Sequence, residues 1–161
     1  MRAAQLFLMT IILGGCVSVH IAPPKAERST GVKFEAPASP FTKAAADNVD
    51  GIWRNTKNGN AISYLSDCSD TSDPPLTSIE QGVLTGLNPY TYVAQKETKF
   101  EGRAARRSTV KGQVDGIPSI VDLLIFKRNN CIYILSYAGL EQHHETNKKS
   151  FDEFISRFKT P

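Results

Sequence analysis

Four consecutive segments with the composition of β-strands constrain the fold of this chain more than any other feature of its sequence. The segments cover residues 90–94, 108–114, 120–126 and 131–137. The first is rich in β-branched and aromatic residues, the second alternates, and the last two are nearly continuous apolar runs. Asp115-Gly116 and Arg128-Asn129-Asn130 supply turn residues between the last three segments. The pattern predicts a four-stranded antiparallel meander.

The third and fourth of these strands are apolar on both faces. Residues 120–126 and 131–137 lack the apolar and polar alternation of a strand that faces water on one side. We therefore expect them at the centre of a sheet that is covered on both faces. Asp122 is the exception, because a carboxylate in a central strand is either paired, placed at the end of the sheet, or part of a functional site.

The N-terminal half of the domain carries a further hairpin signal. Asn58-Gly59 lies between two β-rich segments, residues 51–55 and 61–66, and Asn-Gly in that position favours a tight hairpin turn. Trp53 in the first segment is interpreted as a core residue rather than a ligand platform. Residues 32–35 alternate like a short strand, and residues 41–50 are predicted to be loosely helical.

Two amphipathic segments are predicted to be helices. In the first, apolar residues recur at helical spacing at Leu76, Ile79, Val83, Leu84 and Leu87. In the second, the apolar stripe consists of Phe151, Phe154, Ile155 and Phe158. Each segment begins with the pattern of a capping box, formed by Thr77 with Glu80 and by Ser150 with Glu153. The three phenylalanines indicate that the C-terminal helix docks on the sheet.

These elements predict an α+β fold, with an antiparallel sheet of about six to seven strands and helices packed on its faces. Of the 161 residues, 40% are hydrophobic and 22% are charged, which is typical of a globular protein. We assign residues 32–161 to a single domain. The order of elements, and above all the strands at 120–126 and 131–137 with the closing helix, resembles the fold shared by PsbP proteins, the Mog Ran-binding protein and DcrB-like bacterial lipoproteins. Members of that group are mainly non-catalytic, and the resemblance carries no functional residue onto this sequence.

The N-terminus has the layout of a signal peptide. One basic residue precedes an apolar run at residues 3–13, which is too short to cross a bilayer of about 30 Å as a helix. Leu13-Gly14-Gly15-Cys16 then resembles the lipobox of bacterial lipoproteins. That resemblance implies cleavage of residues 1–15 and a lipid on Cys16. The alternatives are an ordinary secretory signal that is cut further on and an uncleaved anchor.

The same resemblance suggests where in the cell the protein is located. Residues 16–31 contain Pro23-Pro24 and few large apolar residues, so we interpret them as the lipidated N-terminus and a flexible tether. In enteric-type sorting, an Asp after the cysteine is a retention signal. This chain has Val17 there, which would mean export to the outer membrane. The expected location is the bacterial cell envelope, at the outer membrane and facing the periplasm.

Two cysteines remain after Cys16, namely Cys68 and Cys131. In an exported protein an even pair invites a disulfide, because oxidising compartments allow the bond to persist. The spacing alone does not bring the two residues within bonding distance, so two buried free thiols are the alternative.

The candidate binding residues are basic and crowd one predicted hairpin: Lys96, Lys99, Arg103, Arg106, Arg107 and Lys111. They are either a solvated surface or a site that docks to lipid headgroups, envelope polysaccharide or an acidic protein. The net charge of +3 is too small to indicate a nucleic-acid partner.

The sequence contains no recognisable catalytic, metal or cofactor motif. His143-His144-Glu145 is interpreted as a surface loop, because adjacent histidines rarely bind one metal. The acidic residues around Cys68 lack the spacing of a calcium loop. We therefore expect a non-enzymatic envelope lipoprotein without a cofactor, whose partners are membrane lipid through the acyl anchor and an envelope protein or anionic surface. The alternative is an envelope hydrolase that uses Asp122 or the acidic cluster.

Overall fold

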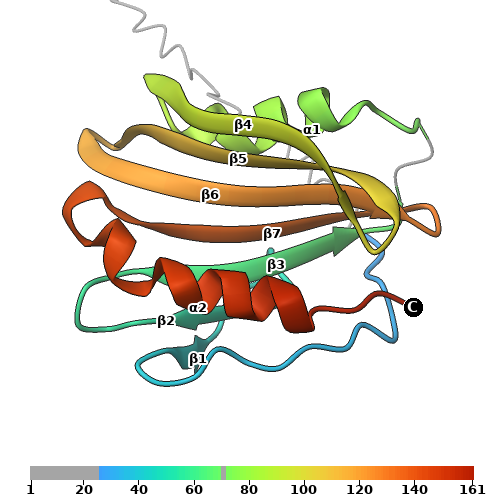
Figure 1. The fold of residues 1–161 in the computed structure, drawn as a ribbon, viewed down its shortest axis with the longest axis horizontal. Coiled ribbons are helices and arrows are strands. Elements are labelled where there is room, and N and C mark those ends of the chain that lie inside the picture. The colour runs from blue at the N-terminus through green and yellow to red at the C-terminus, as the bar shows by residue number, and fades with distance from the viewer. Residues whose placement is uncertain (1–25, 70–71) are drawn as a thin grey trace, which may run out of the picture.

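The computed structural model describes residues 26–69 and 72–161, and within them seven strands form one antiparallel sheet. The order of the strands across the sheet is β1-β2-β3-β7-β6-β5-β4 (Figure 1). Their bounds are β1 Thr42–Ala44, β2 Gly51–Arg54, β3 Ala61–Asp67, β4 Tyr90–Phe100, β5 Arg103–Val114, β6 Ile117–Arg128 and β7 Cys131–Leu140. The fold class predicted from the sequence is confirmed.

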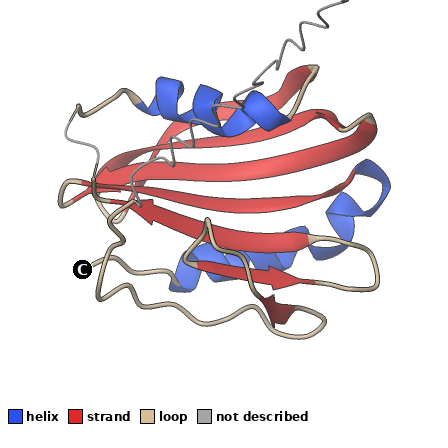
Figure 2. Cartoon of the chain, turned by 180° about the vertical axis from the view of Figure 1, so that it is seen from behind, coloured by secondary structure: helices blue, strands red, loops and turns tan. Residues whose placement is uncertain are grey.

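Helices lie on both faces of the sheet. Helix α2 (His144–Arg157) crosses the face formed by β3 and β7, on the near side in Figure 1. Helix α1 (Leu76–Val83) and the short 3₁₀ helix η1 (Leu84–Gly86) cover β5 and β6 on the opposite face, which faces the viewer in Figure 2. A second 3₁₀ helix, η2 (Glu141–His143), connects β7 to α2. Each helix buries an apolar stripe against the sheet, as an amphipathic helix must.

The larger part of the core lies between α2 and the sheet, where the predicted aromatic stripe is buried. Phe151, Phe154 and Phe158 are each at most 2% exposed. They pack with Trp53 of β2 and with the aromatic residues of β3, β6 and β7. The predictions that Trp53 is a core residue and that the C-terminal helix docks on the sheet are both confirmed.

The smaller part of the core lies under α1. Leu84 and Leu87 pack against Val110, Leu123 and Ile125 of the two strands beneath them. Because successive residues of β6 point to opposite faces, Leu123 and Ile125 reach this cluster while Leu124 and Phe126 reach the other. This arrangement explains the continuous apolar run of β6 and confirms its predicted central position.

The predicted hairpins are present. The β5–β6 turn consists of Asp115 and Gly116, both with positive φ (51° and 79°), as a two-residue hairpin with a primed turn requires. The turn after β6 consists of Asn129 and Asn130, also with positive φ. The β2–β3 hairpin turns at the predicted Asn-Gly sequence. Strands β4 and β5 are considerably longer than their predicted cores.

Both capping-box predictions are wrong. Helix α1 begins at Leu76 after Pro75 and has no side-chain cap, because Glu80 turns toward the sheet and is 1% exposed. Helix α2 begins at His144, which places Ser150 in its interior. In each case a tertiary contact or an earlier start of the helix overrides the local pattern.

Two further local predictions need correction. Residues 41–50 contain the edge strand β1 and no helix, because Thr42–Ala44 pairs with β2. In the predicted strand at 32–35, only Lys33 makes a β-bridge, to Lys159. Residues 26–31 were assigned to the tether, yet the backbone N–H of Cys68 donates to the carbonyl of Glu27 at 2.8 Å. The described domain therefore begins before residue 32.

Candidate functional site

The non-local pairing of β3 with β7 brings the two cysteines together. Asp67, the last residue of β3, lies opposite Ile132 in β7. Cys68 and Cys131 are therefore neighbours at one end of the sheet, and the structure joins them by a disulfide with an S–S distance of 2.01 Å. Of the two alternatives that the sequence left open, the structure contains the bond.

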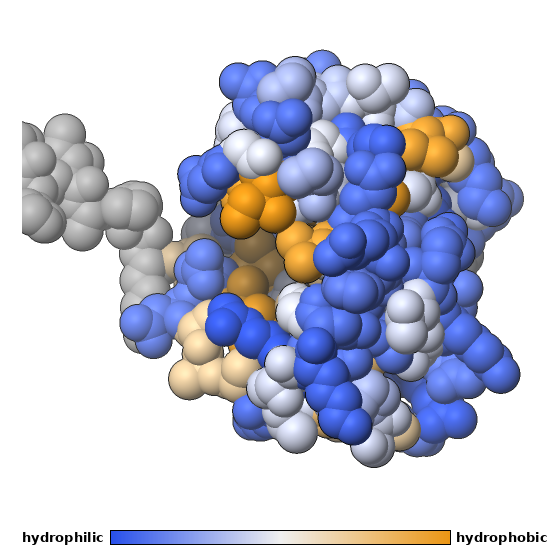
Figure 3. Space-filling model, turned by 90° about the vertical axis from the view of Figure 1, so that its left-hand side faces the viewer, coloured by the Kyte–Doolittle hydropathy of each residue, from blue (hydrophilic) through white to orange (hydrophobic). Residues whose placement is uncertain are grey.

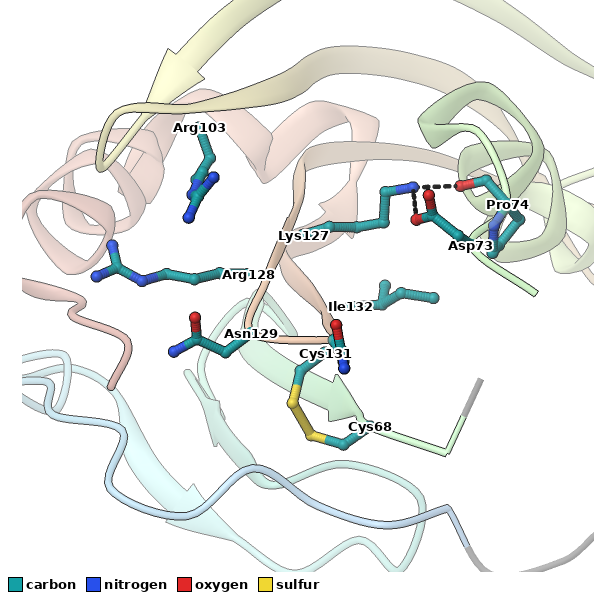
Figure 4. A pocket seen from close by; sticks show the side chains of 10 residues that line it. Cys68, Asp73, Pro74, Arg103, Lys127, Arg128, Asn129, Cys131 and Ile132 are labelled. Carbon is teal, nitrogen blue, oxygen red and sulfur yellow. Dashed lines mark hydrogen bonds and ion pairs between the residues drawn. A yellow bond between two sulfur atoms is a disulfide. The ribbon is translucent and has the colours of Figure 1, made fainter. Parts of the chain in front are cut away.

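A cavity of about 600 Å³ opens beside this disulfide (Figure 4). Its walls come from the segment before α1, the start of β5, the end of β6 and the start of β7. We call this cavity the basic pocket, and define it by its lining residues Cys68, Asp73, Pro74, Arg103, Lys127, Arg128, Asn129, Asn130, Cys131 and Ile132. Its volume is in the range of small-ligand sites.

Cations outnumber carboxylates in the walls of the basic pocket, which contain three basic side chains and Asp73. Lys127 donates from Nζ to the carboxylate of Asp73 and, at 2.8 Å, to the carbonyl oxygen of Pro74. Arg103 has no ion pair with any described residue. Figure 4 shows Arg103 and Arg128 entering the pocket from different strands. The pocket therefore carries a net positive charge.

The guanidinium of Arg128 is only loosely held. Its Nη1 donates a long hydrogen bond of 3.5 Å to the carbonyl oxygen of Glu101 and lies 3.8 Å from a carboxylate oxygen of the same residue, and its buried Nε has no hydrogen-bond partner among the described residues. The same oxygen of Glu101 accepts hydrogen bonds from the backbone N–H and the hydroxyl of Thr160, at 3.0 and 2.6 Å. Burial alone would raise the pKa of Glu101, but these bonds and the charges of Lys159 and Arg128 lower it. The carboxylate oxygen nearest to Arg128 is thus hydrogen-bonded to Thr160, and its contact with the guanidinium stays long.

This arrangement is suited to binding an anion. A guanidinium presents several N–H donors in a planar fork that matches the oxygens of a phosphate or carboxylate. Arg103 forms no ion pair with a described residue, and the contacts of Arg128 Nη1 with Glu101 are long, at 3.5 and 3.8 Å. Lys127 contributes positive charge, although its ammonium donors are partly engaged.

A second polar group is buried under α2. Asp122 accepts a hydrogen bond from the hydroxyl of Thr109 through one oxygen, and its other oxygen lies 2.8 Å from Nε2 of His144. Burial alone would raise the pKa of Asp122, but His144, the Thr109 hydroxyl and the charge of Lys148 lower it. The prediction that this carboxylate is paired is confirmed. The prediction that His144 lies in a surface loop is wrong, since its side chain is 1% exposed.

The buried group does not have the geometry of a nucleophile and its base. In such a pair the hydroxyl bonds to the histidine, and the carboxylate orients the opposite side of the ring. Here the Thr109 hydroxyl bonds to Asp122, while Nδ1 of His144 lies 3.2 Å from the exposed carboxylate of Glu145. The arrangement fastens α2 to the sheet. In residues 26–69 and 72–161, no group of His, Cys, Asp or Glu side chains is placed to hold a metal ion.

The six basic residues singled out in the sequence do not form one surface. Arg106 is buried under α1, with Nε 2.6 Å from a carboxylate oxygen of Glu80, and it also donates to Glu97. Burial alone would lower the pKa of Arg106, but these two carboxylates raise it. Arg106 is therefore a structural cation and is not available to an external anion.

The other five are divided between the two faces and one end of the sheet. Arg107 and Lys111 lie on the face of α2, where they pair with Asp152 and Glu141. Lys96 lies opposite Arg107 in the ladder and shares its face, while Lys99 shares the face of Arg106. Arg103 alone lines the basic pocket. Lys127 and Arg128 also line the pocket but were not among the predicted binding residues. They lie just before Cys131, so a bond from Cys131 to Cys68 would have placed them beside Cys68.

The predicted lipidation residue, Cys16, lies outside the described residues. In the part of the chain that the structure covers, no helix has both the length and the apolar character required to cross a bilayer.

The opposite end of the sheet carries a more apolar hollow. Ile117, Pro118, Leu140, Glu141 and Gln142 line a cavity of about 420 Å³ there. Figure 3 views this end, where apolar groups interrupt a largely hydrophilic surface. Its one charged lining residue already has an ion-pair partner in Lys111. This hollow therefore has fewer charged groups that could bind a ligand than the basic pocket.

Comparison with known proteins identifies the fold. No protein-family model and no curated protein matches the sequence significantly. Among solved structures, cyanobacterial PsbP (CyanoP) from Synechocystis sp. PCC 6803 aligns with a TM-score of 0.57 at 15% identity, over 92% of this chain and 99% of that protein. LpqN, a protein involved in cell envelope biogenesis of Mycobacterium tuberculosis, aligns with a TM-score of 0.59 at 12% identity, over 88% of each chain. The chain has the PsbP-like fold that the order of its elements predicted.

Proposed function

We propose that this protein is a lipid-anchored domain of the bacterial cell envelope that binds a partner and carries out no catalysis. The observation that carries the proposal is the sequence Leu13-Gly14-Gly15-Cys16 directly after an apolar run of signal-peptide length. A cysteine in that position is the acceptor of the lipid in bacterial lipoproteins. The thiol of Cys16 would hold the described domain close to the membrane.

The disulfide supports an envelope location. A bond between Cys68 and Cys131 persists where the surroundings are oxidising, and such bonds are rare in the reducing cytosol. The similarity to LpqN, a protein of cell envelope biogenesis, agrees with this location at the level of the fold. Val17 after the acylated cysteine favours the outer membrane, with the domain in the periplasm.

The arrangement of the polar residues supports a binding role over hydrolysis. The strongest catalytic candidate was Asp122, but its carboxylate is buried, with one oxygen hydrogen-bonded to Thr109 and the other 2.8 Å from Nε2 of His144. By contrast, the basic pocket has a volume suited to a ligand, and its Arg103 forms no ion pair with a described residue. Binding of an anionic group is the activity that this geometry supports best.

Replacement of the proposed lipid acceptor tests the anchor. We expect Cys16→Ala to leave an unprocessed precursor that takes up no labelled palmitate, because the substitution removes the thiol that carries the lipid. Intact-mass spectrometry and palmitate labelling measure this. Val17→Ala is the matched control and should be processed and labelled normally. A Cys16→Ala protein that still matures and fractionates with membranes would contradict the proposal.

Crosslinking in intact envelopes tests the binding role. A non-catalytic binding domain should be recovered with a bound partner, whereas a hydrolase would deplete a substrate without a stable complex. The Asp122→Asn variant separates the two roles further, because it removes the strongest catalytic candidate and leaves the residues of the basic pocket unchanged. Recovery of the same crosslinked partner with this variant is the expected result.

A further inference from the structure

The basic pocket lies at the end of the domain where the described chain begins. The carbonyl of Glu27 accepts from the backbone N–H of Cys68, and the guanidinium of Arg28 donates to the carbonyl of Ser66 at 2.7 Å. These contacts place residues 27 and 28 along the end of β3. Cys68, which follows that strand, is part of the pocket wall. The chain thus enters the domain beside the pocket.

Only a short length of chain separates this end from the proposed anchor. Ala26 follows Cys16 by ten residues, and ten residues span at most about 35 Å when fully extended. Strand β6 alone has 12 residues, which corresponds to a length of roughly 40 Å. The entry end therefore stays near the membrane, while the far end of the sheet can point away from it.

On the basis of the proposed anchor, we propose that the basic pocket binds the phosphate of an anionic phospholipid in the membrane that holds Cys16. The positive pocket and the short connection together favour this ligand. Anionic headgroups attract cationic side chains near the membrane surface, and the attraction falls off within a Debye length. Binding would orient the domain with its disulfide end toward the membrane.

Arg103 and Arg128 are the residues that contact the phosphate. Arg103 forms no ion pair with a described residue and Arg128 makes only long contacts from Nη1 to Glu101, whereas Lys127 is held by Asp73 and Pro74. The amide of Asn129 donates to the carbonyl of Pro161 at 2.8 Å and is also engaged. Two arginines from separate strands can donate hydrogen bonds to a phosphate from two sides, whereas a single surface lysine cannot.

The test uses a chain that starts at Cys16 and contains every described residue. The disulfide occupies Cys68 and Cys131, so Cys16 has the only free thiol. Coupling this thiol to a maleimide lipid attaches the domain to vesicles and raises its local concentration at the surface. Because the coupling replaces the natural acyl group, the result does not depend on whether the cell acylates Cys16.

The measurement is the rate at which phenylglyoxal modifies individual arginines, followed by peptide mass spectrometry. On vesicles containing 30% phosphatidylglycerol in phosphatidylcholine, Arg103 and Arg128 should react at least about fivefold more slowly than on phosphatidylcholine alone. Arg54, an exposed residue of β2, is the internal control and should react equally on both. Equal rates for Arg103 and Arg128 on the two vesicles would overturn the proposal.

A pair of variants with the same loss of charge separates the pocket from general attraction. Arg103→Gln should abolish most of the protection of Arg128 from phenylglyoxal, because the variant lacks one of the two guanidinium groups that bind the phosphate. Arg54→Gln should leave that protection unchanged. Equal losses in the two variants would overturn the proposal, as would protection by millimolar inorganic phosphate without protection by phosphatidylglycerol, which would indicate a soluble ligand.

Discussion

Among single residues, Asp122 is the one whose charge contributes most clearly to stability. Its carboxylate is 2% exposed and lies between Thr109 and His144, on the face that α2 covers. Asp122→Asn removes the charge and leaves His144 buried without its partner, which should reduce the free energy of unfolding by about 3 kcal/mol at pH 7. Urea denaturation of the two proteins measures the difference. Asp115→Asn, in an exposed turn, is the control and should change stability by less than about 0.5 kcal/mol.

The Asp122–His144 pair also predicts the direction in which the stability of the fold changes with pH. The pKa of Asp122 is lower in the folded protein than its ordinary value of 3.8, because the bonds from His144 and Thr109 outweigh the effect of burial. The ionised carboxylate therefore stabilises the fold above that value, and the stabilisation is lost as the pH falls below it toward the folded-state pKa. The stability gap between wild type and Asp122→Asn should narrow below about pH 4. A gap that stays constant from pH 7 to pH 3 would contradict this assignment.

The sequence predicted one partner of this pair and missed the other. Asp122 stood out because a carboxylate interrupts a central apolar strand. His144 gave no such signal, since it lies beside another histidine and a glutamate, as surface residues often do. Its burial depends on where α2 begins and on which face of β6 it meets. Neither is fixed by local sequence.

Helix α2 is the element whose packing the sequence predicted best. Phe154 contacts Trp53 and Tyr64, with ring centroids 5.5 and 6.4 Å away, and it is 2% exposed. Phe154→Ala should therefore lower the free energy of unfolding by about 3 to 5 kcal/mol, because it removes a large buried side chain and leaves a cavity. Thermal and urea denaturation measure the loss. Lys149→Ala on the exposed face of the same helix is the control, and a Phe154→Ala protein as stable as that control would refute the packing.

The starts of both helices show where local patterns fail. Thr77 and Glu80 have the spacing of a capping box, yet Glu80 forms an ion pair with Arg106 on β5. An N-cap contributes about 1 kcal/mol, whereas a buried Arg106 without its carboxylate would be far more costly. The contact with the sheet therefore decides the orientation of Glu80. Apolar periodicity predicted the helices well because burial of the stripe is their main source of stability.

Over the whole molecule, three of the hairpins were predictable and the joining of the two halves was not. The β2–β3, β5–β6 and β6–β7 turns each carry their own signal, such as Asp115-Gly116, whereas the β1–β2 connection carried none. The pairing of β3 with β7 joins segments more than 60 residues apart in sequence, since Cys68 and Cys131 are separated by 63 positions. The basic pocket depends on that pairing, because its walls come from both halves of the chain. The β5–β6 hairpin brings Arg103 close to Arg128, but the wall formed by Cys68 and Asp73 could not be placed beside them from the sequence.

The disulfide fixes this long-range pairing. Closing a loop of this length removes conformational entropy from the unfolded chain, and the chain-entropy model assigns it roughly 4 kcal/mol. The Cys68→Ser, Cys131→Ser double variant should accordingly unfold at lower urea concentration. Cys16→Ser is the control and should leave the midpoint unchanged, because Cys16 lies outside the bonded pair.

The reduced wild-type protein distinguishes the bond from the packing of the sulfurs. Reduction by a thiol reagent, which is itself oxidised, should increase the intact mass by two hydrogen atoms and lower the urea midpoint about as much as the double serine variant does, since both restore the freedom of the unfolded chain. If the double variant is destabilised while reduction of the wild type changes neither mass nor midpoint, the cost comes from replacing buried thiols and the native protein contains no bond. Equal losses instead show that the bond joins the two halves of the sheet and supports the walls of the basic pocket.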